Sequence, residues 1–319
     1  MTTKTLLATV GMISLCATTA FSASTFIIEG GPGGQNTGNY TDAGFAASSG
    51  TDTAAGCTAT GTRYSGTGTY FGPSRYAQAS YTPSVSGYYE IDLSWPSTAG
   101  ETHTAVNLYT GAATGNTAAD IWGNTGGPQG VLATGTMNMY YANVSTWMPF
   151  TTYQFSAGTT YKVGIYGGYK TPYAGGATPA DSSANRVAIG GFRFMAATPL
   201  AATYAGPANN ATDIALTGTS LSWTAGTYDS LYNVWFGTSS SSLTEIGSGI
   251  SASSLSLDSQ NLQGGTEYFW RVDPVNVDVV TTGTVSDFTT AVVPEPSTAL
   301  VGLLGGLGMI GWMKRRGAA

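Results

Sequence analysis

The sequence predicts an all-β protein built from two β-sandwich domains in series. Period-two alternation of apolar and polar residues recurs along the chain, and no sustained 3.6-residue apolar pattern is found between the two termini. Gly, at 45 residues, is about twice its usual share, which is typical of a turn-rich protein. Aromatic residues make up 12 % and supply enough apolar surface for a core. A chain of 319 residues is long enough for two such cores.

Three alternating runs predict strands in the second domain, which we place at residues 208–290 after a linker at 198–207. Leu262 lies six residues before Tyr268, a spacing that lets a tyrosine hydroxyl at a strand start bond back to the preceding turn. The inward-facing residues of the runs are Leu221, Trp223, Tyr232, Val234, Phe236, Tyr268, Trp270 and Val272.

The segments LSW, YNVWFGT, LQGGTEYFWRVD and SDFTT, within residues 203–290, resemble a bacterial fibronectin type III domain. The resemblance implies a seven-strand sandwich that serves as a spacer or a contact surface, and it implies no chemistry. The chain departs from the family pattern at Asn276 to Val280, where members often have a Gly-containing turn. The geometry of that hairpin is left open by the sequence.

The first domain, at residues 23–197, contains the most regular strand of the chain. Tyr89, Ile91, Leu93 and Trp95 share one face and are expected to point inward. The opposite face carries Tyr88, Glu90, Asp92 and Ser94. The two acidic side chains invite a catalytic or metal-binding interpretation, but a solvent-facing one is favoured.

Two further patterns belong to the same domain. Tyr161, Val163 and Ile165 form another inward row, and Gly190-Gly191 is expected to mark a β-bulge because the apolar parity changes across it. The segments YTPSVSGYYEIDLSWP, YQFSAGTTYKVGIYG (with Trp147 before it) and RVAIGGFRF loosely resemble the golvesin or xanthan-lyase-associated sandwich. This resemblance implies a carbohydrate-binding-like jelly roll. It departs at Asn185, where the family tends to have an acidic residue.

The two termini differ from the body of the chain. Lys4, the apolar stretch 6–15 and the small residues that follow predict a secretory signal peptide at 1–22, cleaved after Ser22. Removal of this segment leaves Cys57 as the single thiol, so no intramolecular disulfide is expected. Cys57 is interpreted as a small, partly buried residue, with an intermolecular disulfide as the alternative.

The C-terminal segment 293–319 combines three features. The apolar run 299–313 is roughly 22 Å long as a helix and spans a membrane only marginally. The basic residues Lys314, Arg315 and Arg316 stop transfer on the cytoplasmic side. Before the run, Pro294, Glu295 and Pro296 hold an extended approach to the membrane.

In residues and order, this segment resembles the PEP-CTERM sorting signal of Gram-negative bacteria. The resemblance implies an exosortase-type processing enzyme as a partner, transient anchoring in the inner membrane, removal of the tail and release toward the cell surface. The alternative is an ordinary membrane anchor that stays on the protein.

No constellation of residues predicts a catalytic site, a metal site or a cofactor. His103 is the only histidine, so a His-based metal site or a Ser-His-Asp triad would rest on it alone. Aromatic residues outside the alternating rows are candidates for stacking on sugar rings, unless they cover the ends of the core. These candidate glycan-binding residues are Trp122, Tyr140, Tyr141, Tyr169 and Tyr173.

The sequence therefore favours an exported, non-catalytic protein of the cell surface or the extracellular polysaccharide matrix. Between the terminal basic residues the chain carries seven basic against seventeen acidic side chains, which excludes nucleic acid as a partner. The first alternative is a carbohydrate-binding module protein that recognises a specific glycan through the loop aromatics of the first domain, with extracellular polysaccharide as a candidate partner. A polysaccharide hydrolase is a minor alternative, since two carboxylates suffice for that chemistry.

Overall fold

The structure is a computed structural model that describes residues 25–65, 76–96, 104–110, 131–137, 139, 145–166 and 187–293. Within these ranges the regular elements are strands and two short 3-10 helices, η1 (Thr37–Asn39) and η2 (Asp258–Gln260). The expected signal helix at 1–22 and membrane span at 299–313 lie outside them. In the part of the chain that the structure describes, no helix has the length and apolar character needed to cross a membrane.

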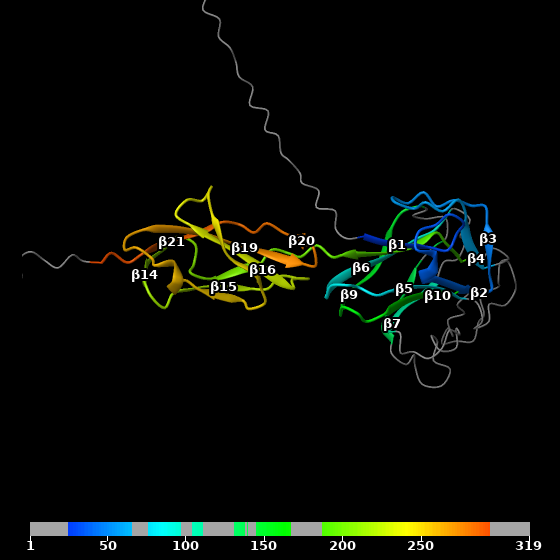
Figure 1. Cartoon of the computed structure of the whole chain (residues 1–319), viewed down its shortest axis with the longest axis horizontal. Coiled ribbons are helices and arrows are strands. Elements are labelled where there is room, and N and C mark those ends of the chain that lie inside the picture. Colours follow the sequence, from blue (N-terminus) through cyan, green and yellow to red (C-terminus); the bar gives the residue numbers. More distant parts are fainter. Residues whose placement is uncertain are drawn as a thin grey trace, which may run out of the picture.

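The first sandwich consists of two main sheets that pack face to face (Figure 1). All strand pairs in both sheets are antiparallel. Sheet A has the order β1 (Thr25–Glu29), β12 (Gly191–Ala196), β6 (Gly87–Ser94), β9 (Met148–Phe155). Sheet B has the order β2 (Tyr40–Ala43), β5 (Tyr76–Tyr81), β10 (Tyr161–Tyr166), β7 (Thr104–Thr110), β8 (Val131–Met137).

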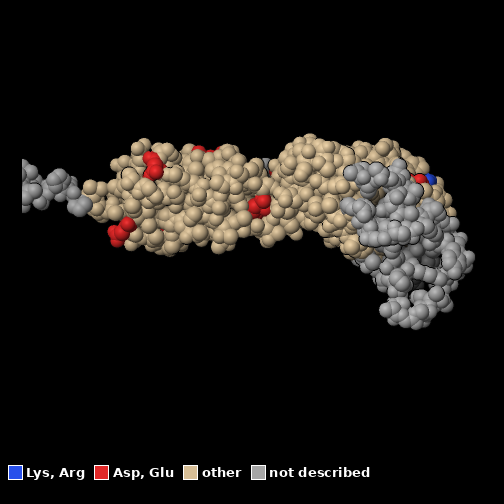
Figure 2. Space-filling model, turned by 90° about the horizontal axis from the view of Figure 1, so that it is seen from below, with Lys and Arg blue, Asp and Glu red and all other residues tan. Residues whose placement is uncertain are grey.

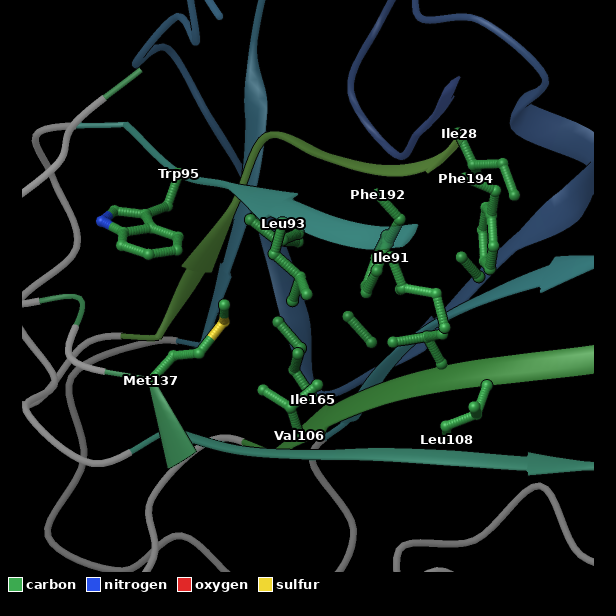
Figure 3. Packing of buried hydrophobic residues seen from close by; sticks show 14 of the residues in the cluster. Ile28, Ile91, Leu93, Trp95, Val106, Leu108, Met137, Ile165, Phe192 and Phe194 are labelled. Atoms are coloured by element: carbon green, nitrogen blue, oxygen red, sulfur yellow. The ribbon is translucent and has the colours of Figure 1, made fainter. Parts of the chain in front are cut away.

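The core of the first sandwich lies between these sheets (Figure 3). The predicted inward row of β6 is confirmed, because Tyr89, Ile91, Leu93 and Trp95 are all buried. The predicted row on β10 is confirmed in the same way. Sheet A contributes Ile28, Ile91, Leu93, Phe192 and Phe194, and sheet B contributes Val106, Leu108, Met137 and Ile165.

A small third sheet lies beside this core, and it corrects the interpretation of the two central glycines. Its order is β11 (Ala188–Ile189), β4 (Thr62–Ser65), β3 (Phe45–Ser48). The chain therefore leaves one sheet at Ile189 and enters sheet A at Gly191, so the parity change marks a switch between sheets and not a bulge. Gly190 has no room for a side chain, since a Cβ there would lie 1.8 Å from an oxygen of Asp52.

The second sandwich also consists of two sheets (Figure 1). The smaller has the order β13 (Thr203–Gly206), β15 (Ser220–Thr224), β18 (Ser254–Ser256). The larger has the order β14 (Ala211–Ile214), β21 (Ser286–Thr290), β19 (Glu267–Asn276), β16 (Leu231–Gly237), β17 (Thr244–Ile250), with β20 (Val279–Val280) paired to β19. β14 and β21 run parallel and the other pairs are antiparallel. The three predicted inward rows are all buried.

A tyrosine closes one turn in each sandwich. As predicted, the Tyr268 hydroxyl reaches back to the preceding turn, where it accepts a hydrogen bond from the backbone N–H of Gln263 at 2.9 Å. Tyr161 accepts the same bond from Ser156 at 2.9 Å. The sequences LQGGTEY and FSAGTTY share this spacing, and the glycine three residues before each tyrosine has a positive φ, 62° and 75° respectively. The second instance was not predicted, although the same pattern was present.

Candidate functional site

The residues that the sequence singled out for function lie outside the described residues. This holds for the candidate glycan-binding aromatics Trp122, Tyr140, Tyr141, Tyr169 and Tyr173. It also holds for the sorting-signal residues Pro294, Glu295, Pro296, Lys314, Arg315 and Arg316. The structure instead brings together two groups of side chains in the described part, one on the outer face of sheet A and one between the sandwiches.

Around Asp92 and Ser94 the outer face of β6 is not the solvated surface that the sequence favoured. Asp92 and Ser94 are fully buried, and Glu90 is half-buried. The reason is a layer of chain above sheet A: Trp147 donates a hydrogen bond from Nε1 to the carbonyl of Ala55 at 2.8 Å. The expectation that both acidic side chains face solvent is therefore wrong for Asp92.

Asp92 is buried together with a cation. Arg193, opposite it on β12, bonds to Asp92 Oδ2 through Nε at 2.7 Å and Nη2 at 2.6 Å. The guanidinium also lies 4.9 Å from the centre of the Trp147 ring, a cation–π arrangement. Burial of an unpaired carboxylate is costly, so Arg193 makes the position of Asp92 tolerable.

Glu90 lies next to this ion pair on the same face of β6. Burial and, second, the neighbouring Asp92 carboxylate raise the pKa of Glu90 above its ordinary value. Asp92 Oδ1 is buried and accepts no hydrogen bond from another described group. The two carboxyl groups and Arg193 therefore form one cluster on this face of the sheet.

Cys57 lies beside two acidic residues and has its sulfur 3.9 Å from the hydroxyl of Ser94. Burial, then Asp52, then Glu29 raise the pKa of its thiol to about 12. Glu29 is fully buried, and its carboxylate accepts hydrogen bonds from the backbone of Gln35, Thr58 and Ala59 at 3.0–3.1 Å. The thiol is half-buried and protonated at neutral pH, which favours the interpretation of Cys57 as a packed structural residue.

The second group of side chains joins the two sandwiches and is centred on Asn276, the last residue of β19. Its side chain is fully buried, and its Nδ2 donates to the carbonyls of Tyr88 and Ala197, both at 2.7 Å. Its Oδ1 accepts from the Tyr88 N–H at 2.8 Å and from the Ser230 hydroxyl at 3.1 Å. An amide has two donors and two acceptor positions, so every one is used.

Two residues beside Asn276 adopt backbone conformations that are uncommon for them. Val277 has φ 57° and Tyr228 has φ 68°, in the left-handed region. Both reach the first sandwich: Val277 packs against its core, and the Tyr228 ring lies 5.6 Å from the Tyr88 ring. Gly87 makes room, because a Cβ there would lie 2.5 Å from Val277. Val277 thus adopts a left-handed conformation in a hairpin, residues 276–280, that contains no Gly.

Hydrogen bonds to the second sandwich also fix the segment of chain that connects the two sandwiches. β12 ends at Ala196 and β13 begins at Thr203, inside the stretch 198–207 that was expected to be the linker. The carbonyl of Pro199 accepts a hydrogen bond from the Thr281 hydroxyl at 2.7 Å, and the Leu200 N–H donates to Thr227 at 2.9 Å. We call Asn276, Val277, Tyr228 and these connections the interdomain joint.

The described residues contain no group of three or more His, Cys, Asp or Glu side chains placed to hold a metal ion. The three arginines in the described ranges each pair with an aspartate, Arg63 with Asp42, Arg193 with Asp92 and Arg271 with Asp273. Figure 2 shows the result on one face, where charged atoms form small separate patches and most of them are acidic. This surface has no concentration of positive charge.

No family model matches the chain, and no curated protein matches its sequence. Among solved structures, a Paenibacillus xanthan lyase is 17 % identical with a TM-score of 0.36, over 54 % of this chain and 13 % of the lyase. A fibronectin type III-like protein from Clostridium thermocellum is 22 % identical with a TM-score of 0.25, over 31 % of this chain and 100 % of that one.

The adhesin domain of Epf from Streptococcus pyogenes is 8 % identical with a TM-score of 0.35, over 74 % of this chain and 78 % of the adhesin domain. Of these structures, the xanthan lyase is much longer than the matched region, and this chain spans only 13 % of it. Similarities of this size establish neither a shared family nor a shared activity. The arguments below depend on the contacts within the chain.

Proposed function

We propose that the chain is an exported, non-catalytic protein whose two sandwiches form a rigid spacer at the cell surface or in the polysaccharide matrix. The interdomain joint carries this proposal. A flexible linker would leave the relative orientation of two domains open, which is the usual expectation for domains in one chain. Here the fully bonded amide of Asn276 continues the hydrogen bonding of sheet A beyond the last residue of β12.

The strained residues of the joint support the same function. A non-glycine residue in the left-handed region costs on the order of 1 kcal/mol or more, and it persists where surrounding contacts over-determine it. The contacts that Val277 and Tyr228 make with the first sandwich offset that cost. The end-to-end arrangement in Figure 1 is therefore expected to persist in solution and to transmit force along the long axis.

The proposed route to the surface depends on the two ends of the chain. The N-terminal signal directs export, and the tail around Pro294, Glu295 and Pro296 anchors the precursor in the inner membrane until an exosortase-type enzyme removes it. The mature protein is then at the cell surface or extracellular. Support for this route comes from the resemblance of the tail residues to a sorting signal.

Intact-mass analysis of the protein recovered outside cells tests the route. Processing predicts a mature N-terminus near Ala23 and a C-terminus near Glu295. A mass that includes the chain through Ala319 would contradict it. A second measurement separates anchoring from processing: in cells that lack the processing peptidase, the full-length precursor is expected to accumulate in the inner-membrane fraction, and unchanged shedding would refute the proposal.

A further inference from the structure

A strip of aromatic and hydrogen-bonding side chains crosses the outer face of sheet A. The pairing register places Arg193 opposite Asp92, and Glu90 between Met195 and Thr152. These side chains point away from the core because they alternate with its buried members along β6 and β12. We call Trp147, Arg193, Asp92, Glu90, Tyr88 and Tyr228 the outer strip.

Each end of the outer strip carries a half-buried aromatic platform. Trp147 is held at one end by its bond to Ala55 and by contact with sheet A, where a Cβ on Gly191 would lie 3.1 Å from the ring. At the other end, the rings of Tyr88 and Tyr228 lie 5.6 Å apart. Tyr228 belongs to the second sandwich, so this end is complete only when the joint is formed.

The middle of the strip carries one ion pair and one half-buried carboxyl group. The guanidinium of Arg193 pairs with Asp92, and Glu90 has a raised pKa because of burial and, next, Asp92. Phosphate groups need unpaired cations, and the strip offers none among its described residues. A cationic partner could not pair with Asp92, because this aspartate is fully buried and already paired with Arg193. The charge balance thus favours a neutral ligand.

The position of the strip also argues against an extended peptide. Peptides that add a strand bind at a sheet edge, whereas β6 and β12 each have hydrogen-bonded neighbours on both sides. A hydroxyl-rich ligand fits better. Sugar rings stack their apolar faces on aromatic side chains, and their hydroxyls bond to carboxyl, guanidinium and threonine groups such as Glu90, Arg193 and Thr152.

We propose that the outer strip binds a neutral polysaccharide chain that runs from Trp147 past the half-buried Arg193 and Glu90 to the Tyr88–Tyr228 pair, with the buried Asp92 holding Arg193 in place. Asp92 and Tyr88 are four residues apart on β6, and the rise per residue of a strand separates them by about 13 Å. This distance leaves room for a short run of sugar rings. The inference deepens the proposed function and rests on it for the class of ligand. It makes the joint part of a binding site as well as a mechanical connection.

The test measures binding of the purified full chain to polysaccharide. The polysaccharide is extracted from the cells that produce this protein and is separated into a neutral and an acidic fraction. The wild type is expected to bind the neutral fraction. Trp147→Ala and Tyr228→Asn are each expected to weaken binding at least tenfold. Asn is chosen at residue 228 because it adopts positive φ readily. Near-ultraviolet circular dichroism establishes that each variant is folded, and Tyr88→Ser replaces any variant that is not.

Trp235→Ala is the matched control. Trp235 lies on the outer face of the second sandwich, with Arg271 stacked 5.2 Å from its ring centre and paired with Asp273. The Trp235→Ala variant is expected to bind the neutral fraction as strongly as the wild type does. The proposal is overturned if the wild type binds only the acidic fraction or neither, or if the control loses binding as strongly as Trp147→Ala. Such results leave the processed C-terminus, and hence the proposed surface function, intact.

Discussion

Replacing Asn276 by Ala is expected to lower the free energy of unfolding by about 4 kcal/mol. The substitution removes four hydrogen bonds, each worth about 1 kcal/mol net. Tyr88 keeps one other partner for its carbonyl, since the Ala197 N–H donates to it at 2.9 Å. The Tyr88 N–H and the Ala197 carbonyl lose the partner provided by Asn276. A loss of this size lowers the Tm by about 10 °C.

The assay is urea denaturation of the full chain, followed by the fluorescence of its tryptophans. Asn233→Ala is the matched control, because the Oδ1 of Asn233 accepts from the Gly249 N–H at 3.0 Å, an exposed bond within the second sandwich. The control is expected to lose less than about 1 kcal/mol. If Asn276→Ala loses no more than the control, the joint contributes little and the argument for a rigid spacer is refuted.

The remaining predictions concern the first sandwich. Burial raises the pKa of Glu90 above 4.5, so the folded state holds this proton to higher pH than the unfolded state and loses stability as pH rises through the raised pKa. Glu90→Gln should therefore match the wild type near pH 4 in denaturant titrations and exceed it near pH 8; parallel curves would contradict this. With a thiol pKa of about 12, Cys57 should react with a disulfide reagent at pH 8 only after denaturation, and rapid native reaction would count against its burial. Gly190→Ala forces a methyl group against Asp52 and should cost about 3 kcal/mol in the same titrations, whereas Gly38→Ala meets open space and should cost under about 1 kcal/mol.

Local patterns predicted the strands well because strand formation and turn closure depend on residues that are near in sequence. The alternation of Tyr89, Ile91 and Leu93 is enough to define a buried face, and the six-residue spacing before Tyr268 is enough to define its corner. The same rule misjudged Asp92. Alternation tells which residues share a face, but whether that face meets water depends on what lies above it, here Trp147 from a distant part of the chain.

The joint was visible in the sequence only as a departure from a family pattern at residues 276–280. Asn276 meets Tyr88 across 188 residues of chain, and no period or spacing encodes a contact of that range. The same holds for Arg193 and Asp92, which are 101 residues apart. Which polar side chains are buried and paired was therefore decided by the tertiary structure.

By itself, the sequence determined that this chain is a β protein with a sparse, acidic surface and two distinctive termini, because composition and short-range alternation suffice for those properties. Only the tertiary structure decided that Asn276, Val277 and Tyr228 hold the two sandwiches together, and that Trp147 and Tyr88 lie at the two ends of one surface. The physical reason is that hydrogen bonds and ring contacts depend on positions in space, and these are fixed only when the sheets have paired and packed.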